Sequence, residues 1–302
     1  PTITTSNSST VKVSAAALTV AKAATAPAPL TAAQVLALTG DIPAGTVIKD
    51  TAANIQTNLK ALGALATFTN ISSITLSDTK AGTISVARAD LTGDLSSAGN
   101  SDPNLAILKK ITSAYTLNVT GLTASDALSL KTPLKTTTLT VSITDTVDNI
   151  TSNLTALQTA AKAKSIASIT IPAPASGTTK PILSITAAQL KASPELLATI
   201  KGDYDLTITG VAAADAVTVA GNADKVLKAS GSLSTQSKIS INDTSANLVK
   251  SIAALETAAT AGRLTSITVS DGKALVLTEA QIKADGHFLA TQFTNKTNIE
   301  AT

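Results

Sequence analysis

Apolar residues recur with helical spacing in three related stretches of the chain. In the first stretch, Ile55, Leu59 and Leu62 stand at positions i, i+4 and i+7, which places them on one face of a short helix. The other two stretches repeat this spacing, and each of the three opens on an Asp-Thr pair. Either residue of that pair can cap a helix by accepting hydrogen bonds from its first free amides. The pattern predicts equivalent helices at residues 50–62, 145–157 and 243–255.

Short segments with alternating apolar residues follow each predicted helix, as is typical of strands. After the first helix, residues 73–76 and 83–86 form two such segments, separated by a polar stretch at 77–82 that resembles a hairpin turn. The two later units carry corresponding segments at 168–171 and 182–185, and at 266–269 and 274–277. We therefore expect a pair of neighbouring strands in every unit.

The remainder of each unit adds further helices and strands in the same order. The first unit adds a helix at 105–111, a strand at 115–121 and a Thr-rich strand at 136–143. The second unit adds helices and strands at 186–200, 204–210, 212–227 and 238–241. Strand 204–210 matches strand 115–121 at its Tyr, Leu and Gly positions. This agreement predicts tandem copies of one structural unit.

Tandem copies favour a repeat architecture over two ordinary domains. We divide the chain into an N-terminal partial repeat with a donor-like strand at 1–47, repeat 1 at 48–142, repeat 2 at 143–240 and a truncated repeat 3 at 241–302. The expected fold is α/β, a solenoid-like tandem array of short helices and short strands. The alternative is an all-β chain of sandwich-like modules, because Thr- and Val-rich segments at this spacing also suit sandwiches.

The two ends of the sequence fall near the same point of the repeat. An alternating segment at 10–14 contains Val11 and Val13, and the final segment at 297–302 contains Ile299. We expect these three residues to take part in assembly, with one chain supplying the layer that the end of another lacks. Such head-to-tail contacts generate a filament when they do not close into a ring. The alternative is that both ends are degenerate caps, as terminal repeats often are.

An Asn stands at the same place in all three predicted helices, at Asn54, Asn149 and Asn247. Near a helix start, an inward amide can satisfy backbone groups of a neighbouring layer that would otherwise be buried without a partner. We therefore expect a structural role for these residues rather than ligand binding.

The composition restricts the core to small aliphatic side chains. Hydrophobic residues make up 44% of the 302 residues and aromatic residues only 2%, a balance that suits thin, regularly stacked layers. Cys, Met and Trp are absent, which excludes disulfides, thiol catalysis and thiolate metal sites and suits an oxidising exterior. The sequence begins at Pro1, and removal of a secretion signal is the simplest origin of that terminus. No apolar run approaches the length of a membrane helix.

The net charge of +3 comes from 23 basic and 20 acidic residues, and the basic residues are nearly all Lys, scattered singly. Nucleic-acid surfaces need clustered Lys and Arg, usually with aromatic residues for stacking, so nucleic acid is not an expected partner. Attraction to anionic cell-surface polysaccharide stays open.

Few residues could carry catalysis or bind a metal. His287 is the single histidine, and it falls within a predicted helix, where a surface role is expected. Four acidic residues near a polar insertion could offer oxygen ligands to calcium, at Asp78, Asp90, Asp94 and Asp102. No phosphate-binding Gly-rich loop and no metal-spaced His or Glu pair occurs in the sequence. We therefore expect no enzymatic activity and no cofactor, with calcium as the one candidate metal.

Four phrases recur in the sequence, DTxxN(I/L)xxxLxAL at 50–62, SIT(L/I/V) at 168–171, LxxTAAQL at 183–190 and LT(I/V)TGVxAADA at 206–216. They resemble the β-strand repeats of large bacterial surface and secreted proteins, including S-layer-like proteins and repetitive adhesins. The resemblance extends from about residue 10 to the last residue, and it implies an extracellular bacterial setting with a scaffold or adhesive role. Many such proteins carry the calcium-binding G-G-x-G-x-D motif, which this sequence lacks.

These observations predict a secreted structural protein that assembles head to tail, with itself as its partner, into an extracellular filament or surface layer. The alternative function is an adhesin stalk or a polysaccharide-binding module. The sequence leaves open whether the particle is a filament, a two-dimensional lattice or a monomeric stalk.

Overall fold

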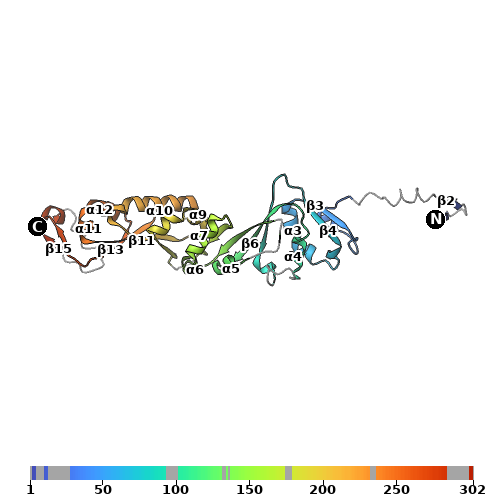
Figure 1. Cartoon of the computed structure of the whole chain (residues 1–302), viewed down its shortest axis with the longest axis horizontal. Helices are drawn as coiled ribbons and strands as arrows, with labels where there is room; N and C mark the ends of the chain where they lie inside the picture. Colours follow the sequence, from blue (N-terminus) through green and yellow to red (C-terminus); the bar gives the residue numbers. More distant parts are fainter. Residues whose placement is uncertain are drawn as a thin grey trace. The chain divides into compact units, whose positions relative to one another are not determined.

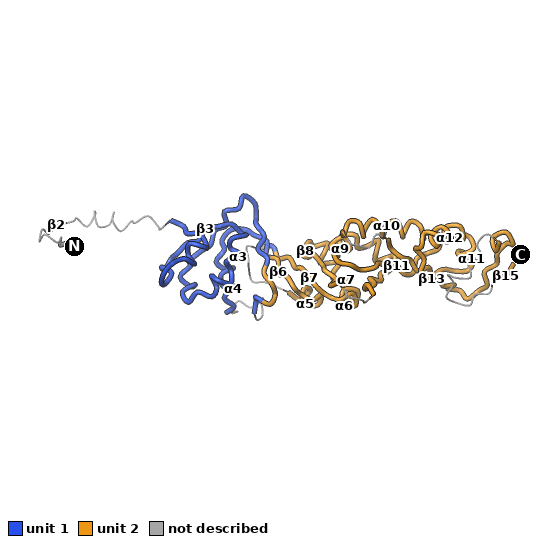
Figure 2. The backbone as a smooth tube through the Cα atoms, turned by 180° about the vertical axis from the view of Figure 1, so that it is seen from behind, with its two compact units in different colours: residues 1–85, 90–117, 132–138 blue, residues 86–89, 118–131, 139–302 orange. Residues whose placement is uncertain are grey.

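The computed structural model describes residues 2–4, 10–12, 28–92, 101–130, 134, 137–173, 179–231, 236–283 and 299–301. Within these residues the protein is a mixed α/β structure in which short helices alternate with short, mostly parallel strands (Figure 1). The chain divides into two compact units, which are coloured separately in Figure 2. Unit 1 comprises residues 1–85, 90–117 and 132–138, and unit 2 comprises residues 86–89, 118–131 and 139–302.

Unit 1 is built around a parallel pair of strands. β3 (Thr46–Asp50) pairs with β4 (Ile71–Leu76), and helix α3 (Ala52–Gly63) connects them. Single-residue bridges extend this pair on both sides, with Leu30 beside Ile48 and Ile111 beside Ile74. The sheet of unit 1 therefore consists of two strands, with one bridging residue beside each of them.

The other elements of unit 1 are short. Helices α2 (Ala32–Leu36) and α4 (Pro103–Leu108) both pack on α3, and two 3-10 turns, η1 (Phe68–Asn70) and η2 (Arg88–Asp90), connect the larger elements. β1 (Thr2–Thr4) and β2 (Thr10–Lys12) form a separate antiparallel pair. β2 confirms that the alternating segment near Val11 is a strand.

Two larger sheets and one small sheet account for the other strands. The first sheet has the order β10-β8-β7-β6-β5, where these strands are β5 (Thr83–Ala87), β6 (Tyr115–Leu122), β7 (Thr137–Thr144), β8 (Ile166–Thr170) and β10 (Ile200–Lys201). The second has the order β13-β12-β11-β9, where these strands are β9 (Ile182–Thr186), β11 (Asp205–Val211), β12 (Lys238–Asp243) and β13 (Leu264–Val269). The third pairs β14 (Leu275–Leu277) with β15 (Ile299–Ala301).

Helices connect the strands of unit 2 and cover their sheets. Between β6 and β9 they are α5 (Ala124–Ser129), α6 (Val147–Ser152) and α7 (Leu154–Lys162). Between β9 and β13 they are α8 (Ala187–Ala192), α9 (Pro194–Thr199), η3 (Ala213–Asp215), α10 (Ala216–Ser230), α11 (Ser245–Lys250) and α12 (Ile252–Thr260). α10 packs on β11 and β12, and α12 packs on α10 and β13, so these two helices cover part of the four-stranded sheet (Figure 1).

Consecutive sheets are linked because the chain alternates between them. It leaves β8 in the five-stranded sheet, enters β9 in the four-stranded sheet, returns to β10 beside β8, and then passes to β11 beside β9. Ile200 of β10 lies opposite Ile169, and Leu206 of β11 lies opposite Leu183. The same alternation occurs earlier, where β4 is followed by β5 and then by Ile111, which lies beside Ile74 of β4. Each sheet therefore shares connecting segments with the next.

The predicted pairing of neighbouring strands is wrong. Segments 73–76 and 83–86 are strands, but β4 pairs with β3 while β5 belongs to the five-stranded sheet. In the same way β8 pairs with β7 and β10, β9 pairs with β11, β13 pairs with β12, and β14 pairs with β15. The polar stretch at 77–82 is therefore a crossing between sheets rather than a hairpin turn.

The three repeated helices begin where the sequence predicts, but only one is continuous. α3 runs unbroken over Ala52–Gly63, whereas the second and third helices are each interrupted, at Asn153 and Ser251. The backbone N–H of Asn153 donates to both Asn149 and Ile150, and its side chain donates to the carbonyl of Asn149 at 2.9 Å. Asn58, at the equivalent place in the unbroken α3, makes the same side-chain hydrogen bond to the carbonyl of Asn54 at 2.8 Å, so this bond is not the cause of the interruption.

Buried aliphatic residues and the two tyrosines form the core. Ile48, Ile74 and Ile208 are fully buried, and Tyr115 and Tyr204 are the largest fully buried side chains. Tyr115 begins β6, and Tyr204 immediately precedes β11. The matching sequences of the two segments predict that these strands are equivalent. The α/β class is confirmed, and the all-β alternative is wrong because helices connect most of the parallel strands. Among the described residues no helix is both long and apolar enough to cross a membrane.

Candidate assembly site

A carboxylate near the start of each repeated helix holds three hydrogen-bond donors. At Asp145, Oδ1 accepts from the backbone N–H of Thr146 at 2.8 Å and from Nδ2 of Asn149 at 2.7 Å. The other oxygen, Oδ2, accepts from the backbone N–H of Ala124 at 2.8 Å. Ala124 opens α5, the helix that follows the neighbouring strand β6. The carboxylate therefore joins the starts of two helices that follow adjacent strands.

The same joint occurs at the two equivalent aspartates. Asp50 accepts from Thr51, Asn54 and Ala32 at 2.8, 2.7 and 3.0 Å. Asp243 accepts from Thr244, Asn247 and Ala213 at 2.8, 2.7 and 2.9 Å. We call these three arrangements the carboxylate joints.

The joints settle which residue of the Asp-Thr pair caps the helix. Thr51, Thr146 and Thr244 are the N-caps, and their hydroxyl oxygens accept from the backbone N–H three residues later. The structural role predicted for the three Asn residues is confirmed, but the predicted partner is wrong. Each Asn amide donates to the nearby Asp carboxylate instead of to the backbone of a neighbouring layer. The charged oxygen is the stronger acceptor and lies only four residues away.

Hydrogen bonding dominates the electrostatics of two of these joints. Partial burial by itself raises the pKa of Asp145, but the hydrogen bonds from Ala124, Asn149 and Thr146 outweigh it and hold the pKa below its ordinary value. For Asp243, burial is again outweighed, here by hydrogen bonds from Asn247, Ala213 and Thr244, so its pKa is also lowered. Both carboxylates are therefore stabilised in the ionised form.

Three of the four predicted calcium ligands are described, and each interacts with other groups of the protein. Asp78 accepts from the backbone N–H of Ala52 at the start of α3 at 2.7 Å, and Asp102 caps α4 by accepting from Leu105 at 2.8 Å while also accepting from Thr92. Asp90 lies 3.8 Å from Nζ of Lys60. Asp94 lies outside the described residues. No cluster of three or more potential metal ligands occurs in the described part of the chain.

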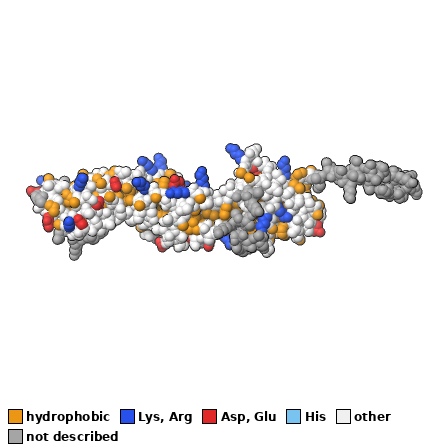
Figure 3. Space-filling model, in the orientation of Figure 1, with side chains coloured by type: hydrophobic (Ala, Val, Ile, Leu, Met, Phe, Trp, Pro, Cys, Tyr) orange, Lys and Arg blue, Asp and Glu red, His pale blue; other side chains and the backbone are white. Residues whose placement is uncertain are grey.

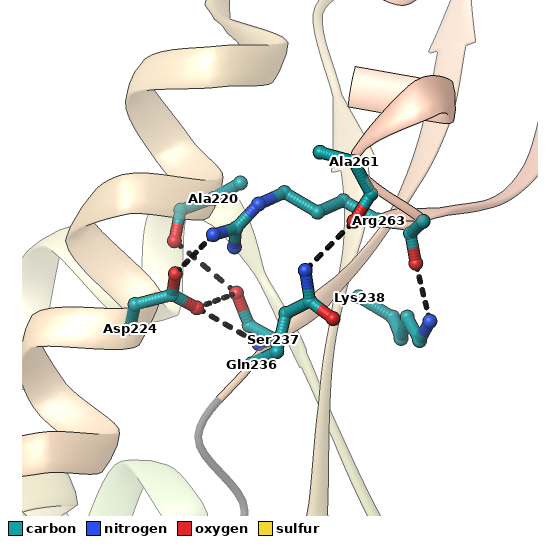
Figure 4. Close-up of polar contacts among 8 residues, drawn as sticks. Ala220, Asp224, Gln236, Ser237, Lys238, Ala261 and Arg263 are labelled. Carbon is teal, nitrogen blue, oxygen red and sulfur yellow. Dashed lines mark hydrogen bonds and ion pairs between the residues drawn. The ribbon is translucent and has the colours of Figure 1, made fainter. Parts of the chain in front are cut away.

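A second polar cluster, which the sequence did not suggest, ties α10 to the strands beside it (Figure 4). Oδ2 of Asp224 lies 2.6 Å from Nη2 of Arg263, and Oδ1 accepts from both the backbone N–H and the hydroxyl of Ser237 at 2.8 Å. Burial raises the pKa of Asp224, but hydrogen bonds from Arg263 and Ser237 outweigh it and lower the pKa. Ser237 is fully buried, so this cluster fastens elements together and offers no exposed nucleophile.

The small C-terminal sheet exposes apolar residues at positions that are buried in the preceding sheet. Ile299 of β15 lies opposite Leu275 of β14, just as Leu206 of β11 lies opposite Leu183 of β9. Leu206 is 1% exposed, whereas Ile299 is 41% exposed. Ala301, which occupies the place of the fully buried Ile208, is exposed as well.

The two strands also differ in their neighbouring strands. In the four-stranded sheet, β11 is covered along its second edge by β12. Among the described residues, β15 pairs with β14 along one edge and with no strand along its second edge. We call the second edge of β15, with Ile299 and Ala301, the open edge. An unpaired strand edge with an exposed aliphatic side chain is a template for pairing with another chain.

The other residues predicted to take part in assembly or chemistry are placed as follows. Val11 is the middle residue of β2. Val13 and His287 lie outside the described residues. Ile299 is therefore the predicted assembly residue whose surroundings can be described.

Two hollows lie between helices and strands of unit 2. A groove of about 550 Å³ between α8 and α10 is lined mainly by aliphatic side chains, with Lys191, Asp215 and Asn222 as its polar residues. A smaller hollow of about 150 Å³ lies between α5, β7 and α7, and Ser165 is the polar residue in its described lining. On the face drawn in Figure 3, the described Lys and Arg side chains are spread out rather than gathered into one patch.

Comparison with models of protein families gave no match, and neither curated proteins nor solved structures gave one.

Proposed function

We propose that this protein is a secreted structural protein that assembles head to tail with copies of itself into an extracellular filament or surface layer on a bacterial cell. The observation that carries the proposal is the open edge, where Ile299 is 41% exposed although the equivalent Leu206 is 1% exposed. Fully burying an aliphatic side chain of this size is worth about 1.5–3 kcal/mol. Burying the remaining surface of Ile299 against another copy therefore favours association.

The repeated joints support an array of like units. Three carboxylate joints with the same donors recur along the chain, and consecutive sheets exchange connecting segments. We infer a solenoid-like array whose layers depend on their neighbours for burial. A head-to-tail contact continues that dependence from one chain to the next.

Electron microscopy of the purified chain tests the proposal. The wild-type protein should form filaments or sheets, and Ile299→Arg should abolish them, because a charge would have to be buried in the new contact. Val217→Arg is the matched control, since Val217 is also a β-branched residue, 49% exposed, but lies on helix α10. Loss of assembly in both variants, or in neither, would contradict a role for the open edge.

The groove between α8 and α10 favours a second candidate function, that of an adhesin stalk or polysaccharide-binding module. Its Lys191 and Asn222 offer a cation and an amide to an anionic sugar. A glycan array probed with the Ile299→Arg variant would measure such binding without assembly. Binding that is lost in Lys191→Ala would support this candidate, and an array without signal would count against it.

We propose no enzymatic activity and no cofactor. The sequence offers a single histidine, His287, as a general base, and the buried Ser237 donates its hydroxyl to Asp224.

A further inference from the structure

Helix α10 carries a half-buried stripe of residues beside the buried stripe that holds it in unit 2 (Figure 1). We propose that this half-buried stripe is a lateral self-contact, in which α10 of one copy packs antiparallel against α10 of a second copy across a two-fold axis at Asn222. Such a contact would join the proposed filaments side by side into a layer. Only that consequence rests on the proposed function, because the contact itself does not use the open edge.

The two stripes of α10 differ in burial. The first stripe is at most 1% exposed, and it consists of Ala216, Ala220, Ala223 and Leu227. The second stripe lines the groove beside α8, and it consists of Asp215, Val219, Asn222 and Val226. We call the second set the groove stripe. Its two valines are half-buried, and its two polar residues are exposed.

The groove stripe has the spacing of a seam between packed helices. Its residues stand at i, i+4, i+7 and i+11, which is the alternation of four and three residues at which the side chains of two helices interlock. The opposite wall of the groove offers Ala187 and Ala188, whose small side chains leave room for a helix to approach. Helices dock into such grooves through residues at this spacing. The groove therefore favours a helix as its occupant.

The groove stripe is self-complementary when two copies of α10 run antiparallel. A two-fold axis at Asn222 brings Val219 opposite the partner's Val226, because these residues lie three and four places on either side of residue 222. The two Asn222 side chains then face each other, and each amide offers the other both donors and an acceptor. The contact pairs apolar with apolar groups and polar with polar groups, so a second copy is the occupant that the sequence of α10 fits.

The charges along α10 favour the antiparallel direction. Asp215 stands at the start of the helix and Lys225 stands in its second half, and both are exposed. Antiparallel packing places Asp215 opposite the partner's Ala229, one helical turn from the partner's Lys225, whereas parallel packing would bring like charges together. Lys191 at the edge of the groove is also exposed, and its long side chain can keep its charge in water.

A single contact of this kind should be weak. We expect an interface made mainly by one helix of 15 residues to bury less than the about 1,200–2,000 Å² of stable complexes. Repetition along a filament would strengthen it, because contacts between linked copies form at a high effective concentration. Covalent trapping is therefore the appropriate measurement for the unassembled chain.

Disulfide trapping tests the contact, and the wild-type sequence contains no Cys that would interfere. The substitutions are made together with Ile299→Arg, so that the open edge does not contribute. Asn222→Cys places a thiol of each copy at the two-fold axis. Val217→Cys, 49% exposed on the same helix and about 140° around it from residue 222, is the control. Because a disulfide needs Cα atoms within about 7 Å, we expect diamide to give at least about tenfold more dimer from Asn222→Cys.

A mixed pair tests the direction of packing. Chains carrying Val219→Cys mixed with chains carrying Val226→Cys should give more dimer than Val219→Cys alone, and the reverse result would overturn the antiparallel arrangement. Equal trapping of Asn222→Cys and Val217→Cys would overturn the lateral contact, whether or not the wild-type chain forms filaments. Trapping of Asn222→Cys with a wild-type chain that forms no filaments would support the lateral contact and overturn the head-to-tail proposal alone.

Discussion

One carboxylate at each joint accepts hydrogen bonds from two backbone amides and one side-chain amide, and those donors belong to two different helices. Hydrogen bonds to a charged acceptor are worth about 1.5–3 kcal/mol each, more than those between neutral groups. The chain repeats the Asp and the Asn that make this contact in every unit. The joints therefore stabilise the connection between adjacent strands at three places.

Replacing a joint carboxylate should destabilise the fold. Asp145→Asn keeps the shape of the side chain but removes the charge that the three donors share, so we expect a loss of about 1–3 kcal/mol in the free energy of unfolding. Urea denaturation followed by circular dichroism measures it. Asp148→Asn, an exposed substitution in the first turn of the same helix, is the control and should cost no more than about 0.3–1 kcal/mol. Equal losses in the two variants would contradict the role of the joint.

The joints also predict how stability depends on pH. The pKa values of Asp145 and Asp243 are lowered in the folded protein, so their contribution is fully present above the unfolded value, about pH 4, and is lost as the pH falls through the lower folded values. The urea midpoint should therefore decline below about pH 4. The double variant Asp145→Asn and Asp243→Asn should show a shallower decline, and an unchanged slope would argue against this linkage.

At the scale of elements, the sequence predicted where most helices and strands lie, because their periodicity is local. It did not predict the strand partners, since an alternating pattern like that of 182–185 defines a buried face without naming the neighbouring strand. The break before Pro194, which separates α8 from α9, was also missed, although Pro commonly begins a helix. Of the site, Ile299 was predicted, but the pairing of Asp224 with Arg263 was not, because it depends on tertiary packing.

The helix ends before β8 and β13 offer a matched comparison. Lys164 and Gly262 occupy the same turn, with φ of 57° and 67°, in the left-handed region that favours glycine. A non-glycine residue there costs roughly 1–2 kcal/mol. Lys164→Gly should therefore raise the free energy of unfolding by about 0.5–1 kcal/mol, after the entropy of the added glycine is counted.

The reciprocal substitution, Gly262→Ala, should lower the free energy of unfolding by about 1 kcal/mol. Apart from residue 262 itself and its two chain neighbours, no heavy atom lies within 4 Å of the place that a Cβ at Gly262 would occupy, so the effect is conformational rather than steric. Thermal and urea unfolding of both variants measure the two changes. Destabilisation by Lys164→Gly would show that the lysine side chain contributes more than its backbone conformation costs.

At the scale of the whole molecule, sheets are completed by segments from other parts of the chain. β8 acquires β10 from a part of the chain that has already contributed β9 to the next sheet, and β4 acquires Ile111 in the same manner. We infer that the open edge of β15 acquires its neighbour from a second copy. The proposed solenoid-like array and the proposed filament are then two consequences of one packing rule.

Sedimentation equilibrium of the wild-type chain over a wide range of concentrations tests this rule most directly. We predict a weight-average mass that rises continuously with concentration past that of a dimer, because each added copy presents another open edge. A mass that stays at that of a single chain at every concentration would contradict it.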